Sequence, residues 1–352
     1  MKYEDRRPPS SGVIFLNLSS NMFTRTRNYY HGLNKIGVDC RWFDISSLGD
    51  LKALSNELKV LQNTGYKVVV TSPSHIIVLW FFLLFRLRPV LDAGWPLIDG
   101  VIVSRKQTGI LGLKAILVDN FSFLFSSLIL IESQSQLNRC RRLFPFYRKK
   151  FFVLMTGVDE NRFENTEPTE NHVETNPRDI FRVLFRGGPQ DEAGLDVLQK
   201  GLLDRSFDNR IKFKIISRGF NSAKLPSSVE TISELVPNEY LSRAFNESDL
   251  VLGQLSSHKR VSWTLPHKFF ESAYFGKPYL VSRQGEMVSL IDKGIAFGFD
   301  PGDSVALFKK IIEISSHPES AKASGVLLKD WYLKHASQAV LSRRFFDILS
   351  GD

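Results

Sequence analysis

The segment TLPHKFFESAYFGKPYLVS, residues 264–282, joins a short helix to a strand with almost no loop, and this decides the fold class. Pro266 fits the first turn of a helix, where its missing N–H costs nothing. Gly276 can take the left-handed conformation that ends a helix, and Pro278 blocks its continuation. The segment therefore predicts a helix over residues 266–275 and a strand over 278–281, the repeating unit of an α/β protein.

The same alternation of short apolar strands and helices extends in both directions from this segment. A polar, acidic stretch over residues 160–179 interrupts it and is typical of a linker. The expected strands are 12–18, 38–45, 66–70, 89–91, 128–131, 151–155, 181–185, 211–217, 229–232, 249–252 and 278–281. This pattern predicts two doubly wound parallel sheets with a cleft between them, where ligands bind outside the carboxyl ends of the strands.

Composition limits the class of protein without choosing its partner. The chain has 352 residues, 43% of them hydrophobic, which suits two domains. A net charge of +9 fits nucleic acid, an anionic membrane or a phosphorylated substrate equally well. Cys40 and Cys140 lack the spacing of a metal or redox motif, and no signal peptide is visible, which indicates a reduced, cytoplasmic protein. No histidine pair has metal-ligand spacing and no Asp-x-Asp occurs, so neither a metal nor a cofactor is predicted.

Two segments indicate contact with a membrane surface, and both have simpler interpretations. HIIVLWFFLLF, residues 75–85, is shorter than the roughly 20 residues of a spanning helix. It is either a buried helix or one that dips into a membrane surface, where Arg86 and Arg88 would meet lipid phosphates. RCRRLFPFYRKKFF, residues 139–152, interleaves cations with aromatic residues. That pattern fits interfacial anchoring, nucleic-acid binding or a solvated helix face.

Several segments, taken in order, resemble glycosyltransferase family 4, whose members have the GT-B fold. Residues 266–278 match the pattern P-x-K-x-x-E-x-x-x-x-G-K-P of its donor-site helix. The other matching segments are LIESQSQ (130–136), RPVLDAGWPLID (88–99), MTGVDENRF (155–163) and VLFRGGPQDEAGLDVLQKGL (183–202). The resemblance covers about residues 12–349. It implies an acceptor-binding Rossmann-like domain over 1–157, a linker over 158–180, a nucleotide-sugar-binding domain over 181–325, and a C-terminal helix over 326–352 that crosses back to the first domain.

The resemblance also implies roles for residues of the second domain. Glu271 would hydrogen-bond the ribose of a nucleotide-sugar, because a carboxylate can accept from two hydroxyl groups. Lys268 would face the diphosphate or the acceptor, and His267 would reach the donor from the same helix start. Gly187 and Gly188 would let backbone N–H groups approach phosphate. The simpler interpretations are a solvated carboxylate, a surface lysine and a plain turn.

The sequence departs from the family pattern at three positions. Trp263 occupies the position of the family's first conserved Glu, which contacts the transferred sugar. Gly188 and Ala193 occupy the positions of the two cations that usually bind the diphosphate. Arg186 and Arg218, near the ends of the first two strands of this domain, are candidate replacements. Without such cations, stabilisation of the leaving group would be weak.

Three residues are candidates in the first domain. Arg25 and Arg27 open a helix after a loop without paired glycines. They could bind an acceptor or phosphate through their side chains, or they could be solvated. Asp92 ends a strand, where a carboxylate can act as a general base, bind acceptor hydroxyls or cap a loop.

The sequence therefore predicts a metal-independent glycosyltransferase that moves a sugar from a nucleotide-sugar to a hydroxyl acceptor, with retention of configuration. The expected acceptor is a saccharide or a lipid-linked precursor of a cell-surface saccharide. The expected location is the cytoplasm, with peripheral attachment to the inner face of the plasma membrane as an option. The alternative is a non-catalytic GT-B scaffold that binds nucleotide or saccharide, or that supports a partner transferase. A nucleic-acid partner is not expected, although the basic segments keep it as a third hypothesis.

Overall fold

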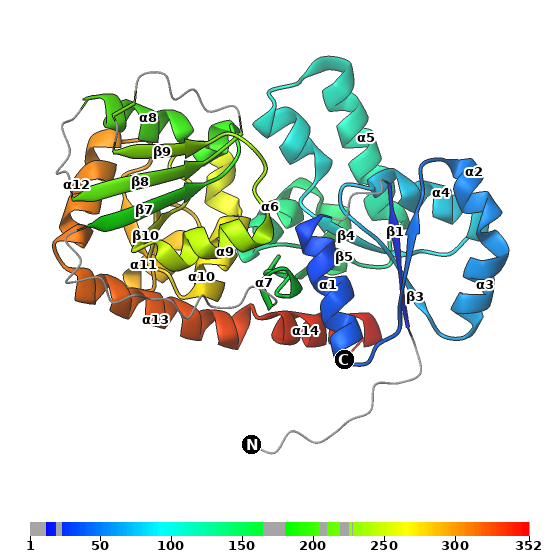
Figure 1. The fold of residues 1–352 in the computed structure, drawn as a ribbon. Coiled ribbons are helices and arrows are strands. Elements are labelled where there is room, and N and C mark those ends of the chain that lie inside the picture. The colour runs from blue at the N-terminus through cyan, green and yellow to red at the C-terminus, as the bar shows by residue number, and fades with distance from the viewer. Residues whose placement is uncertain are drawn as a thin grey trace. The chain divides into compact units, whose positions relative to one another are not determined.

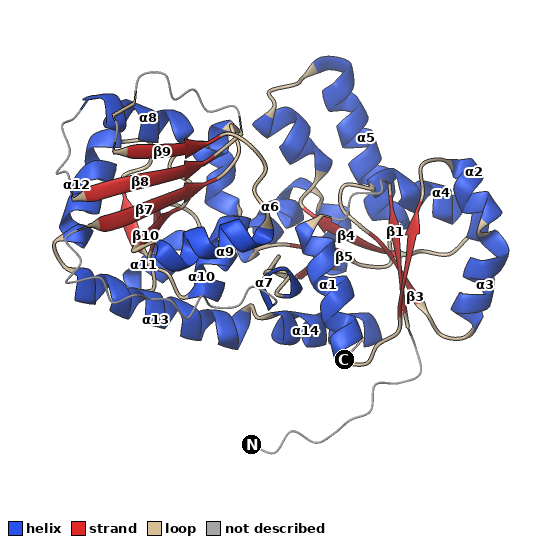
Figure 2. Ribbon diagram, viewed as in Figure 1, coloured by secondary structure: helices blue, strands red, loops and turns tan. Residues whose placement is uncertain are grey.

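The structure is a computed structural model that describes residues 12–18, 23–164, 180–204, 210–218, 225–226 and 228–351. The chain forms two compact units. The first unit comprises Met1–Asp159 and Gln338–Asp352, and the second comprises Glu160–Ser337. Most of the predicted linker lies outside the described residues. Figure 1 shows the elements of each unit, and Figure 2 distinguishes helices from strands.

The first unit is built on a six-stranded parallel sheet with the order β2-β1-β3-β4-β5-β6. Its strands are β1 (Val13–Asn17), β2 (Cys40–Asp44), β3 (Lys67–Val70), β4 (Val90–Gly94), β5 (Ile129–Ile131) and β6 (Phe151–Val153). Its helices are α1 (Thr24–Lys35), α2 (Leu48–Ala53), α3 (Ser55–Asn63), α4 (His75–Phe85), α5 (Gly109–Phe125), α6 (Gln134–Leu143) and α14 (Gln338–Ser350), with shorter helical turns at η1 (Asp99–Ser104) and η2 (Pro145–Lys150).

Both faces of this sheet are buried at β1, which explains why that strand is a nearly continuous apolar run, whereas β2 is partly exposed. Alternate residues of β1 point to opposite faces. Val13 and Phe15 pack in a cluster with residues of α1 and α14. Ile14 and Leu16 pack in a second cluster with residues of α2 to α6. The first and last helices of the chain therefore cover one face together, although more than 300 residues separate Asn28 from Gln338, whose amide donates to the Asn28 carbonyl.

The second unit repeats the design with the strand order β12-β11-β10-β7-β8-β9, again all parallel. Its strands are β7 (Phe181–Arg186), β8 (Ile211–Ile216), β9 (Val229–Ile232), β10 (Leu250–Leu252), β11 (Tyr279–Ser282) and β12 (Phe297–Phe299). Its helices are α7 (Asn161–Glu164), α8 (Leu195–Asp204), α9 (Asn238–Glu247), α10 (His267–Phe275), α11 (Met287–Asp292), α12 (Ser304–Ser315) and α13 (Pro318–His335), with turns at η3 (Asp191–Ala193) and η4 (Lys259–Trp263).

Two sets of helices pack on the second sheet. Residues of α8 and α12 form a core cluster with alternate residues of β7, β8 and β10. Helices α10 and α13 pack together through aromatic side chains, and Phe269 of α10 contacts both Trp331 of α13 and Tyr279 of β11. The predicted doubly wound parallel α/β organisation is confirmed for each unit.

The segment from which the fold was predicted folds as a helix and a strand, shifted by one residue at their starts. Pro266 has extended backbone dihedrals and precedes the first helical residue instead of occupying it. Gly276 has a φ of 64°, the left-handed conformation that ends the helix. β11 then begins at Tyr279 and pairs with β10 and β12. The sequence did not predict β12, because Phe297–Phe299 is only three residues long and contains Gly298.

Two predicted helices are each divided in the structure. The helix predicted over 51–63 is split at Leu54 into α2 and α3. The C-terminal helix predicted over 326–352 is divided between α13 and α14. The domain boundary predicted at residue 325 falls inside α13, and the second compact unit extends to Ser337. Helix α14 then packs on α1, where Phe345 contacts Tyr29. Within the described part of the chain, no helix is both long enough and apolar enough to cross a membrane.

Candidate functional site

The strand order of the second unit reverses at β7, which places a site at its carboxyl end. β7 is the first strand of its sheet, with β8 on one side and β10 on the other. In doubly wound sheets, ligands bind where the order reverses in this way, outside the carboxyl ends of the strands. Arg186 is the last residue of β7, and Gly253 directly follows β10. Helix α10 begins close to the same edge, because Lys268 reaches the Gly253 carbonyl.

Glu271 is the centre of a cluster of charges at this edge. Its carboxylate is fully buried and lies 3.0 Å from Nη1 of Arg186. His267, one turn earlier on α10, places its Nδ1 3.2 Å from the other carboxylate oxygen, and Nη1 of Arg162 lies 4.0 Å from that oxygen. Burial is the largest single effect on the pKa of Glu271 and raises it. Arg186, His267 and Arg162 together outweigh burial and lower that pKa to about 2, so the carboxylate is ionised.

Lys268 lies beside this carboxylate but is not at the surface. Its Nζ donates to the Gly253 carbonyl at 2.7 Å and lies 4.4 Å from the centre of the Phe185 ring. Burial lowers the pKa of Lys268, and the positive charge of Arg186 lowers it further, to about 7. The amine therefore changes its protonation near neutral pH, which an exposed lysine would not do. The partner of Lys268 in the structure is a backbone carbonyl, and its predicted role of facing the diphosphate or the acceptor stays a prediction.

Among the side chains that the structure describes around Glu271, positive charge exceeds negative charge. Glu271 contributes one negative charge, while Arg186 and Arg162 are always protonated. Lys268 adds positive charge below neutral pH. Arg186 remains about one third exposed, so a ligand can reach it. A cluster with excess cations at the carboxyl end of a parallel sheet is suited to an anion such as a diphosphate.

Arg162 is a member of the cluster that sequence reasoning missed. It lies on α7, and its Nε and Nη2 donate to the Asn238 side chain of α9 at 3.2 and 2.9 Å. This hydrogen bonding fixes the guanidinium close to Glu271. Arg162 stands inside the segment MTGVDENRF, which was quoted for its Gly-Val-Asp pattern, but nothing in that pattern indicates which side chain faces the site.

The two glycines after β7 do not contribute alike. The N–H of Gly187 donates to the Ile216 carbonyl at 3.1 Å and so extends the pairing of β7 with β8. This N–H is therefore engaged within the sheet, and the phosphate-binding role of Gly187 stays a prediction. Gly188 lies next to the side chain of Gln190. Arg218, the other predicted cation, is exposed and lies just beyond the end of β8. The phosphate-binding roles of Gly188 and Arg218 stay predictions.

The family's second cation position is inside the hydrophobic core. Ala193 belongs to η3 and packs in the cluster that α8 and α12 form on the sheet. The neighbouring Glu192 pairs with Arg260 of η4 at 3.4 Å. Gly194 follows with a φ of 69°, and a Cβ there would lie only 2.4 Å from the Ser256 nitrogen. The chain is therefore tightly constrained at this turn, and a lysine at position 193 would not fit as a simple replacement.

The predicted residues Arg25 and Asp92 form a closed ion pair in the first unit. Nε of Arg25 donates to the carboxylate at 2.9 and 3.1 Å, and Nη2 lies 2.8 Å from it. Nη1 donates to the Leu154 carbonyl at 2.8 Å, and the guanidinium lies over the Tyr29 ring. Both side chains are buried. The carboxylate of Asp92 neutralises Arg25 directly, and the buried Glu132 also acts on this guanidinium, so no positive charge is in excess. The geometry favours a structural role, and action as a phosphate ligand or general base stays a prediction.

Arg27 points to a different carboxylate. Its Nε lies 3.9 Å from Asp159, whose other oxygen is 2.9 Å from Nδ1 of His31. Asp159 is buried, while Arg27 and His31 are each about one third exposed. Arg25 and Arg27 are only two positions apart on α1, but they belong to separate clusters.

Comparison with known proteins supports the fold and leaves the reaction open. No protein-family model and no curated protein matches the chain. HepE of Anabaena, solved with UDP-glucose, matches with a TM-score of 0.69 and 14% identity over 97% of this chain and 100% of that one. Sucrose-phosphate synthase of Thermosynechococcus elongatus matches with a TM-score of 0.70 and 12% identity over 97% and 98% of the two chains.

A third solved structure with a similar fold is an epimerase, so the fold is not confined to proteins such as HepE and sucrose-phosphate synthase. UDP-GlcNAc 2-epimerase of Neisseria meningitidis, bound to UDP-GlcNAc, matches with a TM-score of 0.54 and 12% identity over 97% of this chain and 100% of that one. At these identities the likeness is one of fold. The chain has the GT-B fold, with two Rossmann-like units.

Proposed function

We propose that the protein is a glycosyltransferase that binds a nucleotide-sugar at the carboxyl edge of its second sheet. The observation that carries the proposal is the excess of cations around Glu271, where the strand order reverses. A nucleoside diphosphate needs positive charge for its phosphates and a hydrogen-bond acceptor for its ribose hydroxyls. Arg186, Arg162 and Lys268 supply the first, and Glu271 supplies the second.

Binding would exchange one partner of Glu271 for another. In the structure, Nη1 of Arg186 lies 3.0 Å from the Glu271 carboxylate. A bound diphosphate would compete for Arg186 and leave the carboxylate to accept from the ribose. When the bond from sugar to diphosphate breaks, negative charge develops on the leaving phosphate, and the same cations would stabilise it. This scheme uses no metal ion, and it gives His267 the role of orienting Glu271 from one turn away.

The acceptor and the stereochemistry are also part of the proposal. The resemblance to family 4 favours retention of configuration and a hydroxyl acceptor on a lipid-linked saccharide. It also favours work on the cytoplasmic side of a membrane. Both cysteines are buried and unpaired, which fits a reducing compartment. HepE binds UDP-glucose, so UDP-sugars are the first donors to test.

A non-catalytic scaffold remains the second candidate, because specific residues favour it. Trp263, Gly188 and Ala193 occupy positions where the family has one acid and two cations. Ala193 is buried in the core, so no cation at that position contributes to the site. A scaffold would bind nucleotide without breaking the bond between the sugar and the diphosphate.

The experiment that tests the proposal measures release of nucleoside diphosphate from UDP-, GDP- and ADP-sugars, with and without membrane lipid extract as the acceptor. We expect release that depends on the acceptor, persists in a metal chelator, and is lost in Glu271→Gln. The anomeric configuration of the product, read by NMR, tests retention. Binding of one nucleotide without release would favour the scaffold. Absence of both binding and release would refute the transferase and the scaffold alike.

A further inference from the structure

Helix α5 of the first unit exposes an unusual number of large apolar side chains. Ile110 is 85% exposed, Leu113 57% and Leu117 47%, and Phe121 and Leu124 continue the same stripe at helical spacing. The buried side of the helix includes Phe123, which packs in the core of the unit. Monomeric proteins rarely expose a contiguous apolar surface of this kind, and its usual meaning is contact with a protein or a membrane.

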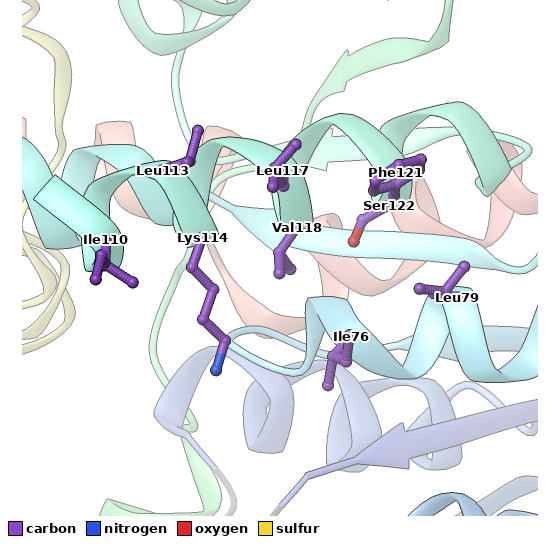
Figure 3. Close-up of a pocket in the computed structure, with 9 residues that line it drawn as sticks. All are labelled: Ile76, Leu79, Ile110, Leu113, Lys114, Leu117, Val118, Phe121 and Ser122. Atoms are coloured by element: carbon purple, nitrogen blue, oxygen red, sulfur yellow. The ribbon is translucent and has the colours of Figure 1, made fainter.

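The stripe continues into a groove between α5 and α4. Figure 3 shows Ile110, Leu113, Leu117 and Phe121 along α5, with Ile76 and Leu79 of α4 beside it. The groove has a volume of about 230 Å³, and its lining is almost entirely apolar. Lys114 is the charged residue of the lining. Two helices therefore contribute to one continuous apolar surface.

Every exposed charge of residues 67–158, the stretch that contains α4 and α5, is positive, and exposed acids lie outside it, among them Asp50 of α2 and Glu57 of α3. Residues 67–158 are all described, and the acidic residues among them are Asp92, Asp99, Asp119 and Glu132, each at most 5% exposed. Asp119, the acid of α5, accepts from the backbone N–H groups of Leu97 and Ile98, so it faces inward. The exposed cations of the same stretch include Arg86, Arg88, Arg105, Lys114, Arg141, Arg142, Arg148 and Lys149.

Two of these cationic groups lie at opposite ends of α5. Arg105 and Lys106 lie in the segment just before the helix, which begins at Gly109. At its other end, Nζ of Lys150 donates to the Phe123, Leu124 and Ser126 carbonyls and so caps the helix. Burial lowers the pKa of Lys150, and the positive charge of Arg88 lowers it further. Arg88 therefore lies near Lys150, at the C-terminal end of α5. The apolar surface is therefore bordered by positive charge.

We propose that this surface, defined by α5 and the adjoining side of α4, binds an anionic lipid bilayer, with the α5 stripe inserted at the level of the headgroups. An apolar stripe flanked by arginine and lysine is the pattern of helices that lie in a membrane interface. The cations would contact lipid phosphates while the leucines enter the acyl region. The inference concerns the first unit and holds whether or not the proposed transfer reaction is correct.

The charge pattern favours a bilayer over other occupants. A second copy of the chain, docked by twofold symmetry, would bring this cationic surface against itself. Nucleic acid would satisfy the cations, but it would leave Leu113, Leu117 and Phe121 against a charged backbone. An anionic bilayer satisfies both parts of the surface.

The test is flotation of the full-length protein with vesicles of phosphatidylcholine, alone or mixed with phosphatidylglycerol. The test variant combines Ile110→Glu, Leu113→Glu and Leu117→Glu. The control combines Leu235→Glu, Val305→Glu and Val326→Glu, which are exposed apolar positions of the second unit. Both triple variants change net charge equally, and all six side chains are exposed, so folding should survive. Thermal unfolding checks that it does.

We expect the wild type and the control to float with the mixed vesicles. We expect the affinity of the test variant for these vesicles to be lower by a factor of roughly ten or more. A second variant, Arg86→Gln with Arg88→Gln and Arg105→Gln, should lose preference for phosphatidylglycerol. A tryptophan in place of Leu113 should show blue-shifted emission on mixed vesicles.

Four results would overturn the proposal. The wild type could fail to bind vesicles, or the test and control variants could lose the same amount of vesicle binding. Binding that survives in the test variant would show that it is purely electrostatic. Self-association of the wild type that the test variant abolishes would show that the surface binds a second copy of the chain. Failure of the sugar-transfer assay would leave all of these readouts unchanged, so the two proposals fail independently.

Discussion

The two units treat a buried ion pair at the carboxyl side of a sheet in opposite ways. In the first unit, Arg25 and Asp92 are both buried and paired, Nη1 of Arg25 donates to the Leu154 carbonyl, and the buried Glu132 adds negative charge, so no cation is in excess. In the second, one carboxylate, Glu271, faces Arg186, Arg162 and His267, with Lys268 beside it. A balanced pair holds its own unit together. An unbalanced cluster with a partly exposed arginine is prepared for an additional anion.

Breaking the balanced pair should have the largest effect. Asp92→Leu or Arg25→Met alone leaves a buried charge without its partner, so we expect each to lower the free energy of unfolding by about 3–5 kcal/mol. The double variant should cost less than the sum, because neither charge remains. Urea unfolding measures all three. A single variant within about 1 kcal/mol of wild type would mean that the pair is not structural.

Glu271→Gln should distinguish the clusters by their response to an anion. The change leaves Arg186, Arg162 and Lys268 without their carboxylate, and we expect a loss of about 1–3 kcal/mol. Pyrophosphate should restore stability, since a ligand at 100 times its dissociation constant contributes about 2.7 kcal/mol. Thermal unfolding with and without pyrophosphate is the measurement, and Asp92→Asn is the matched control. Equal rescue of both variants, or of neither, would contradict the comparison.

The pH dependence of donor binding should follow Lys268. Its folded pKa of about 7 lies below the ordinary value of 10.5. The native state therefore binds fewer protons than the unfolded state between those pH values, and stability falls as pH falls from about 10.5 to about 7. The affinity for a diphosphate should change with pH in the opposite direction to the stability. A diphosphate favours the protonated amine, so affinity should rise as pH falls through 7, by about tenfold if binding raises the pKa of Lys268 by one unit.

Calorimetric titration of UDP-glucose between pH 6 and about 9 measures this profile. Lys268→Met should flatten it, whereas His267→Asn should keep the step. The opposite result, a step that disappears in His267→Asn and persists in Lys268→Met, would show that His267 and not Lys268 is responsible for the pH dependence.

Adding a cation should have the smallest effect. Gly188 stands where the family has an arginine, and a Cβ there would meet only the flexible Gln190 side chain. We expect Gly188→Arg to strengthen binding of UDP-glucose by about 0.3–1 kcal/mol, because a partly exposed charge is screened by solvent. Ala193→Lys should instead destabilise the second unit, since that position is in the core. Improved binding by the lysine variant would show that the η3 turn is looser than its contacts indicate.

Much of the fold could be predicted from local sequence. The elements that were predicted wrongly or missed have local causes. Apolar runs bounded by Gly, Pro or Asn identified the long strands, such as β1 and β7, because both sheet faces are buried. The three-residue β12 was missed because Gly298 interrupts a run too short to show a period. The break between α13 and α14 carries no glycine or proline. Ala336 and Ser337 end α13 through hydrogen bonds to the Tyr332 carbonyl, which sequence patterns do not show.

The candidate site was less accessible to sequence reasoning because it depends on contacts across long separations. Glu271, His267 and Lys268 share one helix, so the motif brought them to notice together. Arg162 is over 100 residues away in sequence, and its hydrogen bond to Asn238 helps to hold its guanidinium near Glu271. Strand ends predicted that Arg25 and Asp92 lie near a ligand edge, but they could not indicate that the two side chains would pair with each other.

Titration of UDP-glucose into the wild type, Arg186→Gln and Arg283→Gln tests the central claim most directly. Arg283 is a matched control, since it is a partly exposed arginine of the second unit that pairs with Asp292. The account predicts micromolar binding to the wild type and to Arg283→Gln, with roughly tenfold weaker binding to Arg186→Gln. Absence of binding to the wild type, or equal affinity of Arg186→Gln and Arg283→Gln, would contradict the claim that the unbalanced cluster is an anion site.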